Sequence, residues 1–351
     1  MSNLFTSWNL KGLEIKNRIC VPPMVCFGWN GDDGMVTEKS VNHYRAIAKG
    51  GHGLVIQEAA CINRQGRLSG DQLGIWDDAQ IPGLKKIVDA VHAEGTPIFV
   101  QIHHAGVIAS EEDRVCPSDY TVIHKEIEKH GRELTVEEIH VLENEYIQAV
   151  RRAYEAGYDG VELHGCHSYL LSQFMNRRVN RRTDEYNADD MLIVKNILEG
   201  IRKVVPEEFI VGIRLGAFEP TIEDGIAHAK WLEEHGIDFI NVSYGFSQEA
   251  DQIKPEDYPF AAAVYGGKRI KEAVSVPVFA VYGIQNGEMA EAALEDTKCD
   301  MINIGRGVLV NDNWANDVKE GKDPGKCLYC AKCVWRAQTE VCAGKVLLGR
   351  R

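Results

Sequence analysis

The sequence predicts an α/β fold of the TIM-barrel class, (β/α)8, with a short cysteine-rich C-terminal extension. Short apolar runs rich in Val and Ile alternate with longer amphipathic segments, and the alternation repeats eight times. The length of 351 residues exceeds the usual single domain but suits one barrel with an extension. We therefore expect a barrel over residues 1–320 and an extension over residues 321–351.

Eight runs are predicted as strands because each is nearly continuously apolar, as expected for parallel strands covered on both faces. They are residues 19–24, 54–58, 97–102, 160–164, 209–214, 239–243, 277–281 and 301–305. Amphipathic stretches between them predict helices, among them residues 83–93, 136–156, 191–204 and 222–235.

An open doubly wound sheet is the competing architecture. Such a sheet usually carries a glycine-rich dinucleotide fingerprint after its first strand. Here the first strand leads into Pro22-Pro23-Met24-Val25-Cys26, which cannot cradle a pyrophosphate in that way. The barrel is therefore favoured, and the long segment 106–134 is expected to form an excursion above its active face.

Charge and composition exclude several classes of function. A net charge of −13 argues against nucleic-acid partners and repels anionic membranes. No run approaches the ~20 apolar residues of a membrane span, and the N-terminus shows no signal-peptide pattern. We expect a cytoplasmic enzyme, in which the ten cysteines are thiols or metal ligands rather than disulfides.

The fourth predicted strand ends in His164-Gly165-Cys166-His167-Ser168-Tyr169. Two imidazoles three residues apart on a tight turn can converge on one carbonyl oxygen and stabilise an enolate-like transition state. Tyr169 is close enough in sequence to protonate the neighbouring carbon as a general acid. The alternatives are a structural histidine pair or half of a metal site.

Three further strand ends carry polar groups of interest. Gln101 offers a donor and an acceptor that match the edge of a flavin or pyrimidine-like ring, or it satisfies loop backbone. Arg214 in a barrel mouth indicates an anion or an electron-rich ring, or a structural ion pair with Glu162 or Glu58. Gly283, with Gly305 and Arg306, suits the phosphate pocket that barrels form after strands seven and eight.

Together these residues resemble the old yellow enzyme family of FMN oxidoreductases. The resemblance runs from Leu13 through Gly307. Its most specific element is His164-Gly-Cys-His167-Ser-Tyr169-Leu-Leu, followed by the run from Phe174 to Asp184. Gln101-Ile-His-His104-Ala-Gly106 is similar to the family's Gln-x-x-His-x-Gly run.

The resemblance implies noncovalently bound FMN that is reduced by NAD(P)H and then reduces an activated alkene. His164 and His167 would hold the substrate's carbonyl oxygen, and Tyr169 would protonate the α carbon. The implied flavin contacts are Gln101 at the pyrimidine edge, Arg214 near N1 and the C2 oxygen, Pro23, Met24, Val25, Cys26 and Ala59 along the ring, and Gly283, Gly305 and Arg306 at the phosphate.

The sequence departs from the family pattern at three places. Many members have Thr or Cys directly after Pro-Met, whereas here Val25 comes first and Cys26 follows. Val107 replaces a frequent Arg, and Tyr282 stands where Gly is common. The first departure leaves the tuning of the flavin open, whereas the other two concern loop packing and the phosphate pocket.

The last segment contains Cys327, Cys330, Cys333 and Cys342 in a C-x2-C-x2-C-x8-C pattern. Such spacing predicts a metal site, either a 4Fe–4S cluster or a structural zinc ion. It resembles the iron–sulfur branch of the family, of the dienoyl-CoA reductase and trimethylamine dehydrogenase type, although the last gap is shorter than expected there. A cluster would imply an electron-transfer protein as a partner.

Three functions follow as hypotheses. The first is reduction of an activated alkene, and the second is a flavin/4Fe–4S dehydrogenase or demethylase that works with a partner subunit. The third is a barrel lyase or isomerase that uses the histidine pair on a metal without flavin. Arg350 and Arg351 suggest a homo-oligomer, because a C-terminal Arg can reach a neighbour's site in the bacterial branch.

Overall fold

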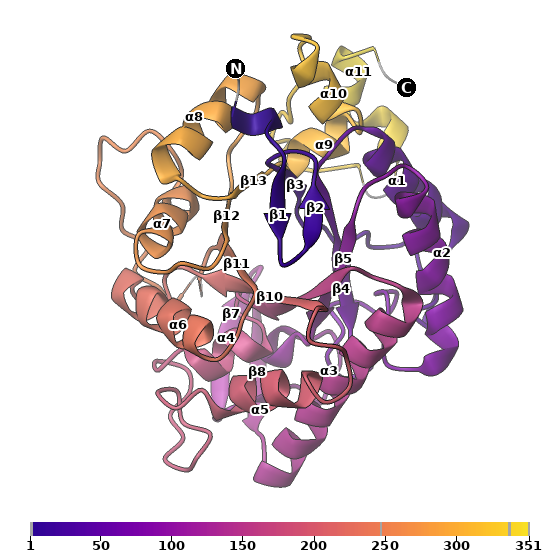
Figure 1. Cartoon of the computed structure of the whole chain (residues 1–351). Coiled ribbons are helices and arrows are strands. Elements are labelled where there is room, and N and C mark those ends of the chain that lie inside the picture. The colour runs from indigo at the N-terminus through magenta and orange to yellow at the C-terminus, as the bar shows by residue number, and fades with distance from the viewer. Residues whose placement is uncertain (1–2, 246–247, 336–337, 350–351) are drawn as a thin grey trace.

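Eight parallel strands form a closed barrel surrounded by helices (Figure 1). The computed structural model describes residues 3–245, 248–335 and 338–349. The barrel strands are β3 (Ile19–Val21), β4 (Leu54–Cys61), β5 (Ile98–His103), β9 (Gly160–Gly165), β10 (Ile210–Gly216), β11 (Phe239–Ser243), β12 (Val278–Val281) and β13 (Met301–Asn303). Their order around the barrel is β10-β11-β12-β13-β3-β4-β5-β9. The predicted (β/α)8 barrel is confirmed, and each predicted strand overlaps an observed one.

Helices pack against the outside of the barrel between successive strands. They are α1 (Glu38–Lys49), α2 (Ile81–His92), α3 (Val136–Ala156), α4 (Leu170–Met175), α5 (Leu192–Ile201), α6 (Ile222–Glu234), α7 (Ala262–Lys271) and α8 (Gly287–Thr297). The helix α3 coincides with its predicted range, while α2, α5 and α6 differ from theirs by no more than three residues at either end.

The boundaries of α3 follow from local chemistry. Thr135 accepts a hydrogen bond from the Glu138 N–H, and the Glu138 carboxylate accepts one from the Thr135 N–H. This reciprocal cap satisfies donors that the first turn of a helix leaves free. At the other end Gly157 has φ +91°, a left-handed conformation that glycine adopts without steric cost.

A hairpin closes the amino end of the barrel. It consists of β1 (Trp8–Leu10) and β2 (Leu13–Ile15), and it lies across the middle of the strand ring in Figure 1. Leu10 and Ile15 pack against residues from the starts of the strands, including Phe239 and Phe279, whose rings stack 4.9 Å apart. The interior at this end is therefore filled with apolar side chains.

The segment 106–134 folds into a small sheet of its own. A 3-10 turn, η3 (Gly106–Ile108), leads into β6 (Val115–Cys116), β7 (Tyr120–His124) and β8 (Ile127–Glu133), arranged in the order β6-β8-β7. Gln248, in the loop after β11, donates to the Ile123 carbonyl at 2.6 Å. The predicted excursion is thus an ordered structure that contacts another loop at the carboxyl end of the barrel.

The chain after β13 continues through short elements. These are α9 (Arg306–Val310), α10 (Trp314–Lys319), η4 (Thr339–Val341) and α11 (Ala343–Leu347). The predicted boundary at residue 320 falls directly after α10 and stays a prediction. Arg350 and Arg351 lie outside the described residues. Within the described ranges, no helix has both the length and the apolar character needed to cross a membrane.

Candidate active site

Two adjoining cavities lie at the carboxyl ends of the strands, and Pro23, Met24 and Arg306 contribute to the walls of both. The larger cavity, of about 500 Å³, is lined by the histidine pair, Tyr169 and Gln101. The smaller, of about 170 Å³, lies beside Arg214, Gly283 and the start of α9. This rim is where barrel enzymes place their active sites.

A strained turn positions the histidine pair. His167 has φ +62° and Ser168 has φ +66°, both in the left-handed region that side chains other than glycine rarely adopt. Each such residue costs about 1–3 kcal/mol unless the surroundings hold it. Gln173, on α4, provides such a constraint by donating to the Ser168 carbonyl at 2.6 Å. The turn directs His167 back toward His164.

The two imidazoles meet at the wall of the larger cavity. His164 Nε2 lies 2.9 Å from His167 Nδ1, so a single small atom could contact both nitrogens. The Tyr169 ring stands edge-on to the His164 ring, with centroids 4.7 Å apart. The three side chains that the sequence singled out are therefore brought together.

Burial keeps both imidazoles neutral. Desolvation, followed by the positive potential of its neighbours, lowers the pKa of His164 well below its usual range. Burial and the nearby Arg214 charge lower the pKa of His167 to about 3. A neutral imidazole donates from one nitrogen and accepts at the other, so the pair can offer hydrogen bonds to an oxygen without carrying charge.

A buried polar network connects strands beneath the larger cavity. Gln101 donates to Glu162 at 2.7 Å, and Asn241 donates to the other Glu162 oxygen at 2.6 Å. Asn303 extends the network by donating to Asn241 at 3.0 Å. Burial raises the pKa of Glu162. The network holds Gln101 in place and leaves its carbonyl oxygen available for a ligand.

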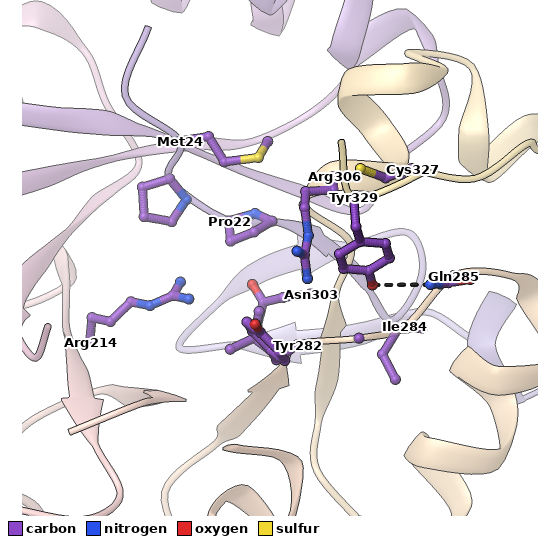
Figure 2. A pocket seen from close by; sticks show the side chains of 15 residues that line it. Pro22, Met24, Arg214, Tyr282, Ile284, Gln285, Asn303, Arg306, Cys327 and Tyr329 are labelled. Atoms are coloured by element: carbon purple, nitrogen blue, oxygen red, sulfur yellow. Dashed lines mark hydrogen bonds between the residues drawn. The ribbon is translucent and has the colours of Figure 1, made fainter. Parts of the chain in front are cut away.

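Arg214 brings an unsatisfied guanidinium to the smaller cavity (Figure 2). Its Nε and Nη1 atoms are buried without a hydrogen-bond partner, while Nη2 lies 3.5 Å from Ser243 Oγ. Among the ion pairs of the described residues, none joins Arg214 to Glu162 or Glu58, although the Arg214 charge acts to lower the pKa of Glu162. Because unpaired buried donors are costly, the guanidinium is poised for an acceptor that enters from the cavity.

Some residues after β3 line the larger cavity, and others pack in the protein interior. Pro23, Met24 and Val25 line the larger cavity. Cys26 instead packs with Trp29 and Trp335, and its predicted contact with the flavin stays a prediction.

Ala59 is buried on β4 beside Gln101 in the strand register. It lines neither of the two cavities, and its predicted contact with the flavin ring stays a prediction.

The predicted phosphate residues gather around the smaller cavity. Arg306 lies between two aromatic rings, 5.0 Å from the Tyr282 centroid and 4.1 Å from the Tyr329 centroid, as Figure 2 shows. Tyr282 has φ +100°, a backbone region that favours glycine. Gly283 and Gly305 complete this wall.

Two of the four terminal cysteines line the cavities. Cys327 lines the smaller cavity and Cys333 the larger, while Cys330 is exposed. In the described part of the chain, the group of three potential metal ligands within 4.8 Å of one another is His164, Cys166 and His167. The terminal sulfurs are not gathered at that spacing.

Sequence reasoning missed several residues of the site. Ser243 contacts His167, His103 contacts His164, and Tyr329 covers Arg306. A signal existed for Ser243, since it is a polar residue that ends an apolar run. None existed for Tyr329, which follows no strand.

Comparison with known proteins agrees with this geometry. The chain is 35% identical to the NADH oxidase of Thermoanaerobacter brockii over 93% of its own length, and it spans 52% of that protein. It is also 35% identical to the NADPH dehydrogenase of Bacillus velezensis, covering 89% of this chain and 93% of that one.

Similar solved structures include morphinone reductase in complex with tetrahydroNAD, with a TM-score of 0.75 and 26% identity over 92% of this chain and 91% of that one. The old yellow enzyme homologue from Zymomonas mobilis gives a TM-score of 0.77 and 25% identity over 93% of this chain and 95% of that one. A 2-naphthoyl-CoA reductase shares the fold, with a TM-score of 0.82 and 24% identity over 92% of this chain and 52% of that one. The chain belongs to the NADH:flavin oxidoreductase / NADH oxidase family, whose model matches residues 3–324.

Proposed function

We propose that the protein is an FMN-dependent oxidoreductase that uses NAD(P)H to reduce the C=C bond of α,β-unsaturated carbonyl compounds. The observation that carries this proposal is the approach of His164 Nε2 to His167 Nδ1, 2.9 Å apart at the wall of a cavity. Two neutral imidazoles whose nitrogens meet at one point suit a carbonyl oxygen that gains negative charge during reaction. Family membership argues against the non-flavin lyase or isomerase.

The residues present fit FMN. Bound FMN would supply a carrier that accepts hydride from NAD(P)H and donates it to the alkene. The unpartnered Nε and Nη1 of Arg214 would bind the pyrimidine end, where negative charge collects. Gln101 would accept from the ring N–H with its carbonyl oxygen. Gly283, Gly305 and Arg306 would hold the phosphate.

The alkene substrate would bind over the flavin in the larger cavity. His164 and His167 would bind its carbonyl oxygen, withdrawing electron density from the β carbon. The β carbon receives a hydride, and Tyr169 would deliver a proton to the α carbon, so the product gains two hydrogens and no net charge. The apolar wall that includes Met24, Val25 and Phe27 would contact the carbon skeleton and exclude water.

Anaerobic turnover tests the proposal. The FMN-loaded protein should oxidise NADH or NADPH in the presence of 2-cyclohexenone and release cyclohexanone. Removing one donor in His164→Ala should lower kcat by roughly 10²-fold, as when an oxyanion donor is lost. The variant Tyr265→Phe, on α7 and outside both cavities, serves as a matched control. Failure of the FMN-loaded protein to reduce any of a panel of enones would reject the proposal.

A second candidate function uses the terminal cysteines as a 4Fe–4S site that exchanges electrons with a partner protein. Tyr329, between Cys327 and Cys330, lies on the Arg306 guanidinium, so the cysteine segment directly contacts the proposed flavin site. A cluster there would supply single electrons. The thiolate donor set fits it, and zinc is the alternative for the same residues.

Metal analysis separates these possibilities. An anaerobic absorption spectrum with a broad iron–sulfur shoulder, and roughly four irons per chain, would support the cluster. Roughly one zinc per chain without iron would support a structural site. Cys330→Ser should lower the metal content, whereas Cys299→Ser, a buried cysteine outside the segment, serves as the control. No metal in protein purified anaerobically would reject both.

A further inference from the structure

Arg306 brings a cation without an acidic partner to the wall of the smaller cavity. Its side chain is partly buried, and no carboxylate in the described part of the chain forms an ion pair with it. The guanidinium instead contacts two aromatic rings, with the Tyr329 centroid at 4.1 Å and the Tyr282 centroid at 5.0 Å (Figure 2). An unpaired guanidinium in a cavity wall indicates a site for an anion.

Stacking on an aromatic ring leaves the hydrogen-bond donors of an arginine free. A guanidinium is planar, and its N–H groups point outward in that plane. An aromatic ring attracts a cation through its face. Tyr329 can therefore hold the Arg306 guanidinium without occupying its N–H groups. Those donors remain available for a phosphate, which arginine binds through two parallel hydrogen bonds.

Both rings are carried by residues in a backbone conformation that side chains rarely adopt. Tyr282 has φ +100° and Tyr329 has φ +54°. Such a conformation persists only where the surroundings hold it, and it is frequent at ligand sites. Gln285 contributes to holding Tyr329, since its Nε2 donates to the Tyr329 hydroxyl at 3.0 Å. Two tyrosines that flank one cation at this cost indicate a site arranged for a ligand.

Tyr329 reaches the cavity from the cysteine-rich segment, whereas the rest of the proposed phosphate wall comes from the barrel. Gly283 follows β12 and Gly305 follows β13, and both line the smaller cavity together with Tyr329. The pocket is therefore completed by a part of the chain that follows the last strand. Because Tyr329 is 48% exposed, its replacement should leave the core of the barrel intact.

We propose that Tyr329 makes flavin binding selective for FMN over riboflavin, because its ring holds the Arg306 guanidinium in place for the 5′-phosphate. An unrestrained arginine side chain loses rotational freedom when a phosphate binds, and prior stacking removes part of that cost. This inference rests on the proposed binding of FMN. Its measure is a ratio of two affinities, which requires no turnover.

Fluorescence titration of the full chain, freed of flavin, with FMN and with riboflavin tests this role. Tyr329→Ala should weaken FMN binding about tenfold and change riboflavin binding by less than about twofold, since the lost cation–π contact acts only on the phosphate ligand. Tyr329→Phe keeps the ring and loses one neutral hydrogen bond, so FMN binding should weaken by about threefold or less. Leu328→Ala, an exposed neighbour that lines neither cavity, is the matched control and should keep both affinities.

A double-mutant cycle tests whether Tyr329 acts through Arg306. Arg306→Ala should weaken FMN binding and leave riboflavin binding unchanged. Adding Tyr329→Ala to this variant should then cause no more than about a twofold further loss, because the two residues form one unit. Additive losses would show that Tyr329 acts independently of Arg306 and would overturn the inference.

The affinity ratio separates this role from a structural one and from the proposed function. Equal losses of FMN and riboflavin affinity in Tyr329→Ala, or no loss of either, would overturn the inference. The expected selectivity in a protein that reduces no enone would support the role of Tyr329 and reject the proposed function. Enone reduction with an unchanged affinity ratio in Tyr329→Ala would support the proposed function and overturn the inference.

Discussion

Trp335 stacks on Trp29, with ring centroids 5.4 Å apart and planes 27° from parallel. The indole N–H of Trp335 donates to the Leu309 carbonyl at 2.8 Å, and the side chain is only 4% exposed. This contact attaches the cysteine-rich segment to the barrel through packing that needs no metal. The segment therefore forms part of the cavity walls and is more than a terminal appendage.

Replacing Trp335 by Ala should detach this segment. Burial of a large aromatic side chain is worth several kcal/mol, on the order of 3–5 for removal from a core. We expect faster proteolysis between Cys327 and Cys342, together with weaker FMN binding, because Cys327 and Cys333 line the two cavities. Limited trypsin digestion and fluorescence titration with FMN would measure both effects. Trp335→Phe keeps the stacking and should lose much less FMN affinity and protease resistance. Equal losses in both variants would contradict the role of stacking.

Arg214→Met should destabilise the reduced flavin. The guanidinium offers two unpartnered donors to a ring that becomes negatively charged on reduction. A hydrogen bond to a charged group contributes about 1.5–3 kcal/mol, which corresponds to a fall of roughly 30–60 mV in a two-electron potential. Anaerobic reductive titration against a reference dye would measure the shift. Arg269→Met, which removes a surface cation, is the control, and an unchanged potential in Arg214→Met would contradict the assignment.

Tyr169→Phe should slow one half-reaction selectively. If the phenol protonates the α carbon, its loss should reduce the rate of flavin reoxidation by an enone by roughly 10²–10⁴-fold. Reduction of the flavin by NAD(P)H needs no such proton and should change little. Anaerobic stopped-flow absorbance follows each half-reaction separately. Equal slowing of both would indicate that Tyr169 only shapes the cavity.

Glu58 should make folding stability depend on pH. Its carboxylate accepts from the Cys26 N–H at 2.7 Å, and burial raises its pKa from 4.5 to about 7. The folded state then holds this proton more tightly than the unfolded state, so the stability that it contributes is present below about pH 4.5 and is lost as pH rises to about 7. The loss is on the order of 3 kcal/mol.

Urea denaturation at pH 5 and pH 8 would measure this effect. Glu58→Gln should show a smaller loss of stability between the two values than the wild type, because the amide does not titrate. The exposed Glu256 provides a control, and Glu256→Gln should keep the wild-type dependence. If Glu58→Gln loses as much stability between pH 5 and pH 8 as the wild type does, other groups cause the pH dependence.

The barrel could be predicted because eight nearly continuous apolar runs alternate with longer amphipathic segments. The sheet of β6, β7 and β8 could not, since its strands are short and β8 is mostly exposed and charged. The pairing of His103 with His164 depends on the register between β5 and β9, where Gln101 lies beside Glu162 and Ile102 beside Leu163. That register depends on packing around the whole barrel and cannot be predicted from the sequence of either strand alone.

Local backbone geometry explains the remaining differences. The chain after β3 leaves regular structure, so alternation could not decide whether Val25 or Cys26 faces the cavity. The Cys26 side chain packs into the cluster of Trp29 and Trp335, and this contact, which is distant in sequence, decides its orientation. His164, His167 and Tyr169, in contrast, lie within six residues at a strand end, and their convergence could be predicted from spacing.

The hairpin of β1 and β2 leaves the barrel with one open end. No molecule that reaches the rim can pass through the barrel axis, because the opposite end is filled by Leu10, Ile15 and the stacked rings of Phe239 and Phe279. Under the proposed function, a nicotinamide and an alkene that both bind in the larger cavity would occupy it in turn. Such alternate occupancy corresponds to ping-pong kinetics, with parallel lines in double-reciprocal plots.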